Sequence, residues 1–146
     1  MTDTVFILNG PNLNLLGTRE PEIYGSDTLA DIEARCADRA AELGLAIDFR
    51  QSNHEGVLVD WLHEAHAMGA VAVIVNPAAY THTSIALLDA AKAIDPPVIE
   101  VHLSDPESRE AFRHESFIGM AAMRTIKGHG AQGYLMALDA VTQINR

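Results

Sequence analysis

Short apolar runs alternate with longer segments of helical periodicity along almost the whole chain. The apolar runs predict strands at residues 5–8, 45–49, 70–75, 98–103 and 125–127. The periodic segments predict helices at residues 28–43, 57–68, 84–94 and 132–144. This alternation is typical of repeated βα units wound around one parallel sheet.

Short connections and right-handed crossovers limit how such units are arranged. We therefore expect an α/β, flavodoxin-like three-layer fold, with a five-stranded parallel sheet in the order 2-1-3-4-5 and helices on both faces. The chain of 146 residues has no break in composition, so one domain over residues 1–146 is expected. The helix at 28–43 is expected to have Asp27 or Ser26 as its N-cap and to stop at Gly44.

Composition excludes several classes of protein. A formal net charge of −10 argues against a nucleic-acid partner held through its phosphates. No run approaches the roughly 20 apolar residues of a membrane span, and the first residues lack the basic start of a signal peptide, so a cytoplasmic protein without membrane contact is expected. The single cysteine, Cys36, is expected to be a small core residue.

Polar side chains gather where the predicted strands end. They are Asn9, Asn12, Asn14, Asn53, His54, Glu55, Asn76, His102 and Ser104. In open parallel sheets ligands bind beyond these strand ends, although loops are polar in most proteins and the pattern alone favours a site only weakly.

Glu100 and His102 carry more information, because two residues apart in a strand they point to the same face. A buried carboxylate and imidazole are costly unless they are paired, so we expect a hydrogen bond between them. His102 would then suit general acid or base catalysis near neutral pH. The alternative is a paired core histidine without a catalytic role.

Residues 10–25 form a long loop after the first strand, and loops of this length are often lids. Arg19 and Tyr24 both lie on it. A guanidinium held against a phenol lowers the pKa of the phenol and makes it a base. The alternative is a surface arginine and a packing tyrosine.

Other polar positions have both a functional and a purely structural interpretation. Residues 76–84 lead into a helix whose free N–H groups suit an anion, although Thr81, Thr83 or Ser84 could simply cap it. Arg109 and Arg113 could grip a carboxylate or face solvent. His63 and His66 lack the zinc-binding spacing and are expected to be solvated, and Trp61 is expected in the core or at a subunit interface.

Several blocks of the sequence together resemble the type II 3-dehydroquinate dehydratases. The match runs through nearly the whole chain, in order and spacing. The blocks are residues 9–17 (NGPNLNLLG), 19–21 (REP), 24–25 (YG), 51–53 (QSN), 76–77 (NP), 80–84 (YTHTS) and 100–104 (EVHLS).

The resemblance implies reversible dehydration of 3-dehydroquinate to 3-dehydroshikimate by anti elimination through an enolate, in the shikimate pathway or in quinate catabolism. It implies that Tyr24, a phenolate beside Arg19, removes the C2 proton. Asn12 would help to hold a water on the enolate oxygen. His102, oriented by Glu100, would protonate the departing C1 hydroxyl.

The resemblance also implies which residues bind the substrate, how the subunits assemble, and that the reaction needs no cofactor or metal. The substrate would be bound by Asn76, His82, the backbone of Leu103 and Ser104, and Arg113. Asp89 would reach the site of a neighbouring subunit in a dodecamer built from trimers. No cofactor and no metal are implied. The other route to this reaction uses a lysine Schiff base, and neither Lys92 nor Lys127 has an evident activating neighbour.

Three positions depart from the family pattern. Ala78 stands where glycine is usual, Asp105 where asparagine is common, and residues 122–127 are unusually basic, so that Arg124 must find a partner. Two rival functions stay open: a flavodoxin-like ligand-binding protein and a catalytically silent oligomeric relative. The first loop lacks a Gly-rich or Ser/Thr-rich phosphate cradle, which weakens the flavodoxin-like reading.

Overall fold

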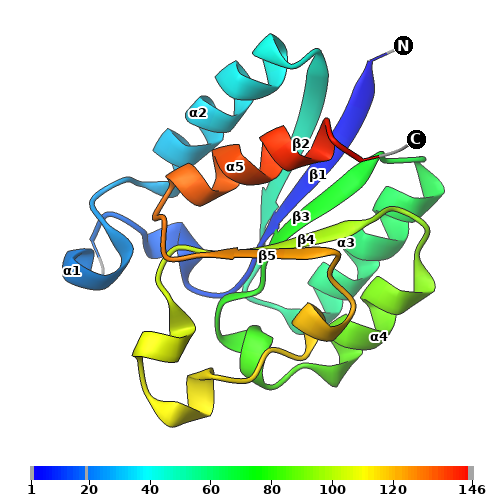
Figure 1. Ribbon diagram of the computed structural model, residues 1–146. Coiled ribbons are helices and arrows are strands. Elements are labelled where there is room, and N and C mark those ends of the chain that lie inside the picture. Colours follow the sequence, from blue (N-terminus) through cyan, green and yellow to red (C-terminus); the bar gives the residue numbers. More distant parts are fainter. Residues whose placement is uncertain (1, 19, 145–146) are drawn as a thin grey trace.

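Five parallel strands form one sheet in the order β2-β1-β3-β4-β5, as the alternation of apolar and helical segments predicts (Figure 1). The computed structural model describes residues 2–18 and 20–144, without the side chain of Tyr24. The strands are β1 Asp3–Asn9, β2 Leu45–Gln51, β3 Ala72–Asn76, β4 Val98–His102 and β5 Arg124–Lys127.

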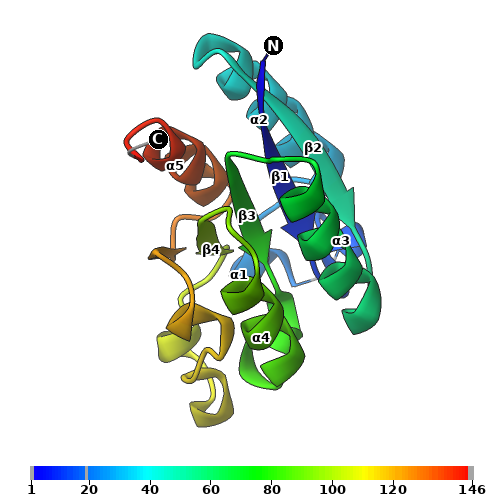
Figure 2. The same cartoon turned by 90° about the vertical axis from the view of Figure 1, so that its right-hand side faces the viewer.

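Helices cover both faces of the sheet, which confirms the three-layer α/β fold. The four long helices are α2 Leu29–Glu42, α3 Glu55–Ala67, α4 Ile85–Ala93 and α5 Gln132–Val141. Helices α2 and α5 lie together on one face, and α3 and α4 lie together on the other (Figures 1 and 2). No helix within the described residues is long and apolar enough to span a membrane.

Successive side chains of the central strands enter opposite cores, because side chains alternate along a strand. Val5 and Ile7 of β1 belong to the core under α2 and α5, whereas Phe6 and Leu8 belong to the core under α3 and α4. Cys36 is fully buried in the first core, as predicted, and burial raises the pKa of its thiol to about 12. The central strands are therefore fixed from both sides, and their polar ends are rigidly placed.

The N-cap predicted for the first long helix is wrong. Thr28, and neither Asp27 nor Ser26, caps α2: its hydroxyl accepts a bond from the Asp31 N–H, and the Asp31 carboxylate accepts one from the Thr28 N–H. This reciprocal capping box satisfies two donors at once. At α4 the cap is Ser84, one of the three candidates, whose hydroxyl accepts from the Leu87 N–H.

Three connecting segments contain short helices that the sequence did not predict. The connection between β3 and α4 holds a 3-10 helix at Ala78–His82. The loop after β1 holds a 3-10 turn at Leu13–Leu15 and a one-turn helix, α1, at Pro21–Tyr24. The segment between β4 and β5 holds 3-10 turns at Pro106–Ser108, Ala111–Arg113 and Ile118–Met120. Figure 2 shows this segment beyond the end of the sheet, beside α4.

Candidate active site

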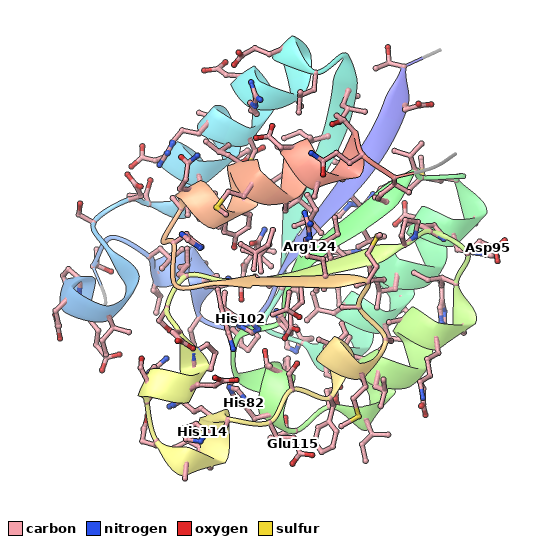
Figure 3. All side chains as sticks on the ribbon, viewed as in Figure 1. His82, Asp95, His102, His114, Glu115 and Arg124 are labelled. Carbon is pink, nitrogen blue, oxygen red and sulfur yellow. The ribbon has the colours of Figure 1, made fainter. Side chains whose placement is uncertain are left out.

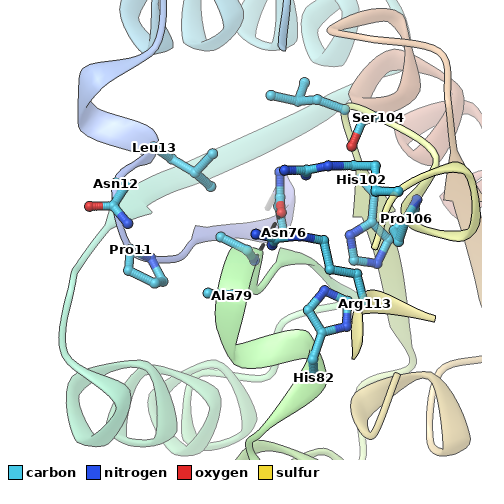
Figure 4. A pocket seen from close by; sticks show the side chains of 13 residues that line it. Pro11, Asn12, Leu13, Asn76, Ala79, His82, His102, Ser104, Pro106 and Arg113 are labelled. Carbon is cyan, nitrogen blue, oxygen red and sulfur yellow. Dashed lines mark hydrogen bonds between the residues drawn. The ribbon is translucent and has the colours of Figure 1, made fainter. Parts of the chain in front are cut away.

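A pocket lies at the carboxyl ends of β1, β3 and β4, where the sequence predicts the site (Figure 4). Seven predicted site residues line it: Asn12, Asn76, His82, His102, Leu103, Ser104 and Arg113. The other lining residues are Pro11, Leu13, Ala78, Ala79, Pro106 and Arg109. Asn12 and Pro11 lie on one rim, and His82, Arg113 and His102 lie across the opening. The fold thus brings together residues from three separate parts of the chain.

The pair on β4 forms the hydrogen bond that the sequence predicts. His102 Nε2 lies 2.5 Å from Glu100 Oε2, and His102 lines the pocket while Glu100 is completely buried behind it. A carboxylate accepts the hydrogen bond, so Nε2 carries a proton. Glu100 therefore fixes the ring, and Nδ1 is the nitrogen left for proton exchange.

Glu100 is held in its ionised form. Burial alone would raise the pKa of Glu100, but hydrogen bonds from His102, Ser116 and Thr125 outweigh it, and the pKa is lowered. The Ser116 hydroxyl donates to Oε2 and the Thr125 hydroxyl donates to Oε1. No pattern in the sequence pointed to these two hydroxyl residues. Only the β4–β5 register, which places Thr125 beside Glu100, would have pointed to one of them.

His82 offers an acceptor to the pocket. Its Nδ1 lies 2.8 Å from the backbone carbonyl of Glu115, which can only accept, so Nδ1 bears the proton. Partial burial is the main reason why the pKa of His82 is lowered. A neutral ring with its lone pair on Nε2 follows, and this suits a hydroxyl donor on a ligand.

A buried network sets the orientation of Asn76. Its Nδ2 donates to the Tyr134 hydroxyl (3.0 Å), and that hydroxyl donates its own hydrogen to Asn9 Oδ1 (2.6 Å). Asn76 Oδ1 accepts from the Ala78 N–H (3.1 Å). The oxygen is thus turned toward Ala78, and the second hydrogen on Nδ2 is the group that Asn76 has left to offer a ligand. No motif in the sequence singled out Tyr134.

The backbone after β4 provides a donor. The carbonyl of Leu103 accepts from the Gly130 N–H (2.9 Å), and that of Ser104 accepts from the Gly128 N–H (3.1 Å). In a trans peptide the C=O and the following N–H point in opposite directions, so the Ser104 N–H points away from the Gly128–Gly130 turn. The Ser104 N–H can therefore donate a hydrogen bond to an anionic group in the pocket.

Two arginines give the pocket positive charge. Arg109 and Arg113 both line it, although each side chain is mostly buried. Arg113 Nε donates to Glu110 Oε1 at 2.8 Å, which holds the guanidinium while leaving its terminal nitrogens for other acceptors. Of the two interpretations of this arginine pair, the pocket favours contact with a bound anion.

The first loop is braced against β2. Asn12 has a left-handed backbone (φ 69°), and its N–H donates to Asn53 Oδ1 at 3.0 Å. Gln51 Nε2 donates to the same oxygen and to the carbonyl of Gly10. A Cβ at Gly10 would lie 2.5 Å from the Pro77 carbonyl oxygen, so only glycine fits there. These contacts fix Asn12 at the rim.

Ala78, one of the departures from the family pattern, adopts the left-handed region with φ 53°. Glycine occupies this region without strain, whereas alanine does not. The residue nevertheless keeps its N–H on Asn76. Asp105 causes no comparable problem, because its carboxylate accepts from the Glu107 N–H, as an asparagine oxygen would.

Comparison with known proteins decides the family. The sequence profile of Dehydroquinase class II matches residues 3–142. A 3-dehydroquinate dehydratase from Acidovorax sp. (strain JS42) is 58% identical over 147 residues, covering 98% of this chain and 99% of the relative. The chain belongs to the class II dehydroquinase family.

Other relatives agree with this assignment. A 3-dehydroquinate dehydratase from Maricaulis maris (strain MCS10) is 61% identical over 140 residues, covering 96% of this chain and 95% of the relative. The crystal structure of type II dehydroquinase from Propionibacterium acnes superposes with a TM-score of 0.94 at 41% identity, covering 99% of both chains. The flavodoxin-like fold is thus that of the class II dehydroquinases.

Besides Glu100, which is buried behind the pocket, three predicted site residues are not seen to line the pocket of this dehydroquinase. Arg19 and the side chain of Tyr24 lie outside the described residues. Asp89 is exposed on α4 and does not line the pocket of its own chain. The structure therefore leaves their roles as predictions.

The basic residues Lys127, Lys92 and Arg124 differ in their exposure and in their partners. Lys127 Nζ forms an ion pair with Glu107 at 2.9 Å, and Lys92 is exposed on α4. Arg124, labelled in Figure 3, is also exposed, and it forms no ion pair with another described residue. In the single chain the charge of Arg124 lies in water, and its need for a partner stays a prediction.

The remaining predictions concern α3. His63 and His66 are exposed, as predicted, and His66 Nδ1 accepts from the Asp95 N–H. Trp61 is half-buried against the core under α3 and α4, beneath the guanidinium of Arg50. Among the described residues no three His, Cys, Asp or Glu side chains converge as metal ligands.

Proposed function

We propose that the protein catalyses the reversible dehydration of 3-dehydroquinate to 3-dehydroshikimate by general acid–base catalysis. Family membership and relatives named 3-dehydroquinate dehydratase support this hydro-lyase reaction, in the shikimate pathway or in quinate catabolism. The observation that carries the mechanism is the pocket-lining His102, anchored through Nε2 to the buried Glu100.

The acid half of the reaction belongs to His102. Its Nδ1 gives a proton to the C1 hydroxyl, which departs as water. Glu100 stays ionised and stabilises the imidazolium before the transfer. The geometry is suited to this role because the donor ring is rigid and its anchor is shielded from water.

The base half belongs to Tyr24, which removes the C2 proton as a phenolate held beside Arg19. Tyr24 ends the one-turn helix α1 in the long loop after β1. The loop acts as a lid over the strand ends. Asn12, on the rim of the pocket, helps to hold a water on the enolate oxygen.

The substrate is oriented by groups on all sides of the pocket. The backbone at Leu103 and Ser104 binds its carboxylate. Asn76 donates to one hydroxyl oxygen, and the neutral His82 accepts from a hydroxyl hydrogen. Arg113 completes the contacts with its terminal nitrogens. These roles match the donors and acceptors that the hydrogen bonds of each group leave free.

The assembly is a homo-oligomer in the cytoplasm, a dodecamer of trimers in which Asp89 of one chain enters the site of another. The exposure of Asp89 and its absence from the pocket of its own chain are consistent with this role. Mixed oligomers test it: His102→Ala and Asp89→Ala chains, each weakly active alone, regain activity together if sites are shared. Activity no higher than the sum of the two variants would contradict sharing.

The reaction is tested by following the enone chromophore of 3-dehydroshikimate as it forms from 3-dehydroquinate. Wild type is expected to be active, and His102→Ala and Tyr24→Phe to be slower by about 100-fold or more. An inactive wild type would support the silent-relative alternative. Rates unchanged by either substitution would overturn the assigned roles.

A second measurement separates this mechanism from a covalent one. Borohydride added with substrate reduces a Schiff base and labels its lysine irreversibly. We expect full activity after this treatment, and mass spectrometry should find Lys92 and Lys127 unmodified.

The absorption spectrum of the purified protein tests the flavodoxin-like alternative. A flavin spectrum would favour that alternative.

A further inference from the structure

A second pocket reaches the Glu100–His102 pair from the side of β5. Four of its lining residues also line the first pocket: His82, His102, Pro106 and Arg113. Its other walls include Glu100, Ser116, Gly119 and Thr125, which the first pocket does not contain. The anchor of the catalytic histidine therefore has surroundings of its own, separate from the substrate pocket.

Two hydroxyl groups hold the Glu100 carboxylate from this side. The Ser116 Oγ lies 2.5 Å from Oε2, and the Thr125 Oγ1 lies 2.8 Å from Oε1. The Gly119 N–H donates to Ser116 Oγ at 3.0 Å. The Ser116 oxygen accepts that bond. Its hydroxyl hydrogen is directed to Glu100, because an ionised carboxylate can only accept. We call Ser116 and Thr125 the hydroxyl clamp.

The clamp favours one charge state of Glu100. Among the described residues, His102, Ser116 and Thr125 all donate to this carboxylate. A proton on Glu100 would turn one oxygen into a donor and displace one of these three bonds. In a fully buried position the lost bond would leave a polar group without a partner, which is costly.

The clamp comes from β5 and from the segment that precedes it. Thr125 lies opposite Glu100 in the register of β4 with β5. Ser116 and Gly119 come from the segment before β5. A Cβ at Gly119 would lie 2.9 Å from both Glu100 Oε1 and Ser116 Oγ, so any larger residue would force the clamp apart.

We propose that Ser116 and Thr125 are positioning residues for the dehydration, holding Glu100 as a fixed anion so that His102 stays aimed as the general acid. This inference rests on the proposed function. Neither hydroxyl residue lines the substrate pocket. The clamp therefore acts on the chemical step and leaves substrate binding unaffected.

Kinetics of matched threonine variants test the clamp. Thr125→Val removes the hydroxyl at nearly constant shape and is expected to lower kcat about tenfold, with KM within about twofold of wild type. Thr125→Ser, which keeps the hydroxyl, restores kcat to within about twofold. Thr142→Val is the control, because that hydroxyl donates to the carbonyl of Asp139 at the end of α5, far from Glu100 in the fold. A structural role alone would lower the unfolding midpoint without this kcat pattern.

Titration of the Glu100 carboxyl tests the clamp without reference to activity. Its carboxyl carbon, followed by NMR in ¹³C-glutamate protein, is expected to titrate at higher pH in Thr125→Val and Ser116→Ala than in wild type. The neighbouring charges of His82, His102, Arg113, His114, Glu107 and Lys127 are the same in all these proteins. Unchanged titration in both variants would overturn the clamp. An inactive wild type with the expected shift would sink the proposed function alone.

Discussion

At the scale of single residues, the buried side chain of Tyr134 sets which hydrogen-bonding groups Asn76 presents to the pocket. Tyr134 is completely buried on α5, where burial raises the pKa of its phenol, so it stays protonated. Its one hydrogen goes to Asn9, and its oxygen accepts from Asn76. The phenol therefore decides which way the Asn76 amide is turned.

Tyr134→Phe is expected to weaken both stability and substrate binding. The free energy of unfolding should fall by about 2 kcal/mol, because buried groups of Asn9 and Asn76 lose their partner. KM should rise several-fold, since the amide of Asn76 is free to rotate. Urea unfolding and steady-state kinetics measure the two effects.

Tyr80→Phe is the matched control, because the Tyr80 hydroxyl donates to the carbonyl of Asn53 in an exposed position. Its loss should change stability by less than about 1 kcal/mol. Equal losses in the two variants would contradict the assignment to Tyr134.

Ala78→Gly should stabilise the protein. Relief of the left-handed alanine is favourable by about 1–2 kcal/mol, and the greater freedom of glycine in the unfolded chain offsets about 0.4–1 kcal/mol of this. A net gain of about 0.5–1 kcal/mol in urea unfolding is expected. Reduced stability would mean that the backbone at residue 78 is not strained.

At the scale of elements, the sequence predicts strand ends well and contacts between distant segments poorly. Asn76, His102 and Ser104 could be placed because parallel strands end at one edge of a sheet. Ser116, Thr125 and Tyr134 could not, since they reach Glu100 or Asn76 only after the chain has folded back. Periodicity reports burial but not the partner across the sheet.

The start of α2 illustrates the same limit and yields a prediction. Thr28→Ala removes one half of the capping box and should cost about 1 kcal/mol of unfolding free energy. Ser26→Ala, at a residue that local sequence also allowed as the cap, should cost nothing measurable. Thermal unfolding of both variants decides; a larger loss for Ser26→Ala would show that the cap lies elsewhere.

At the scale of the whole molecule, two pocket groups link stability to pH. The pKa values of Glu100 and His82 are lower in the folded protein than their ordinary values of 4.5 and 6.5. The unfolded chain therefore binds protons that the folded chain does not. The stability from each group is present above its ordinary pKa and is lost as the pH falls through its folded value.

Urea unfolding at a series of pH values tests this linkage. Wild type should lose stability as the pH falls below about 6.5, and more steeply below about 4.5. Glu100→Gln should be less stable at neutral pH but have a flatter acid slope. Glu33→Gln, at an exposed glutamate on α2, should retain the wild-type slope. An acid slope in Glu100→Gln as steep as that of wild type would contradict the account.

The central claim is that His102, anchored by Glu100, protonates the departing hydroxyl. It is tested most directly by a substrate analogue whose C1 hydroxyl is replaced by fluoride, a leaving group that needs far less help from an acid. The kcat of His102→Ala relative to wild type is measured with both compounds. We expect a large loss with 3-dehydroquinate that nearly disappears with the fluoride. An equal loss with both compounds would contradict the role of His102 as the general acid.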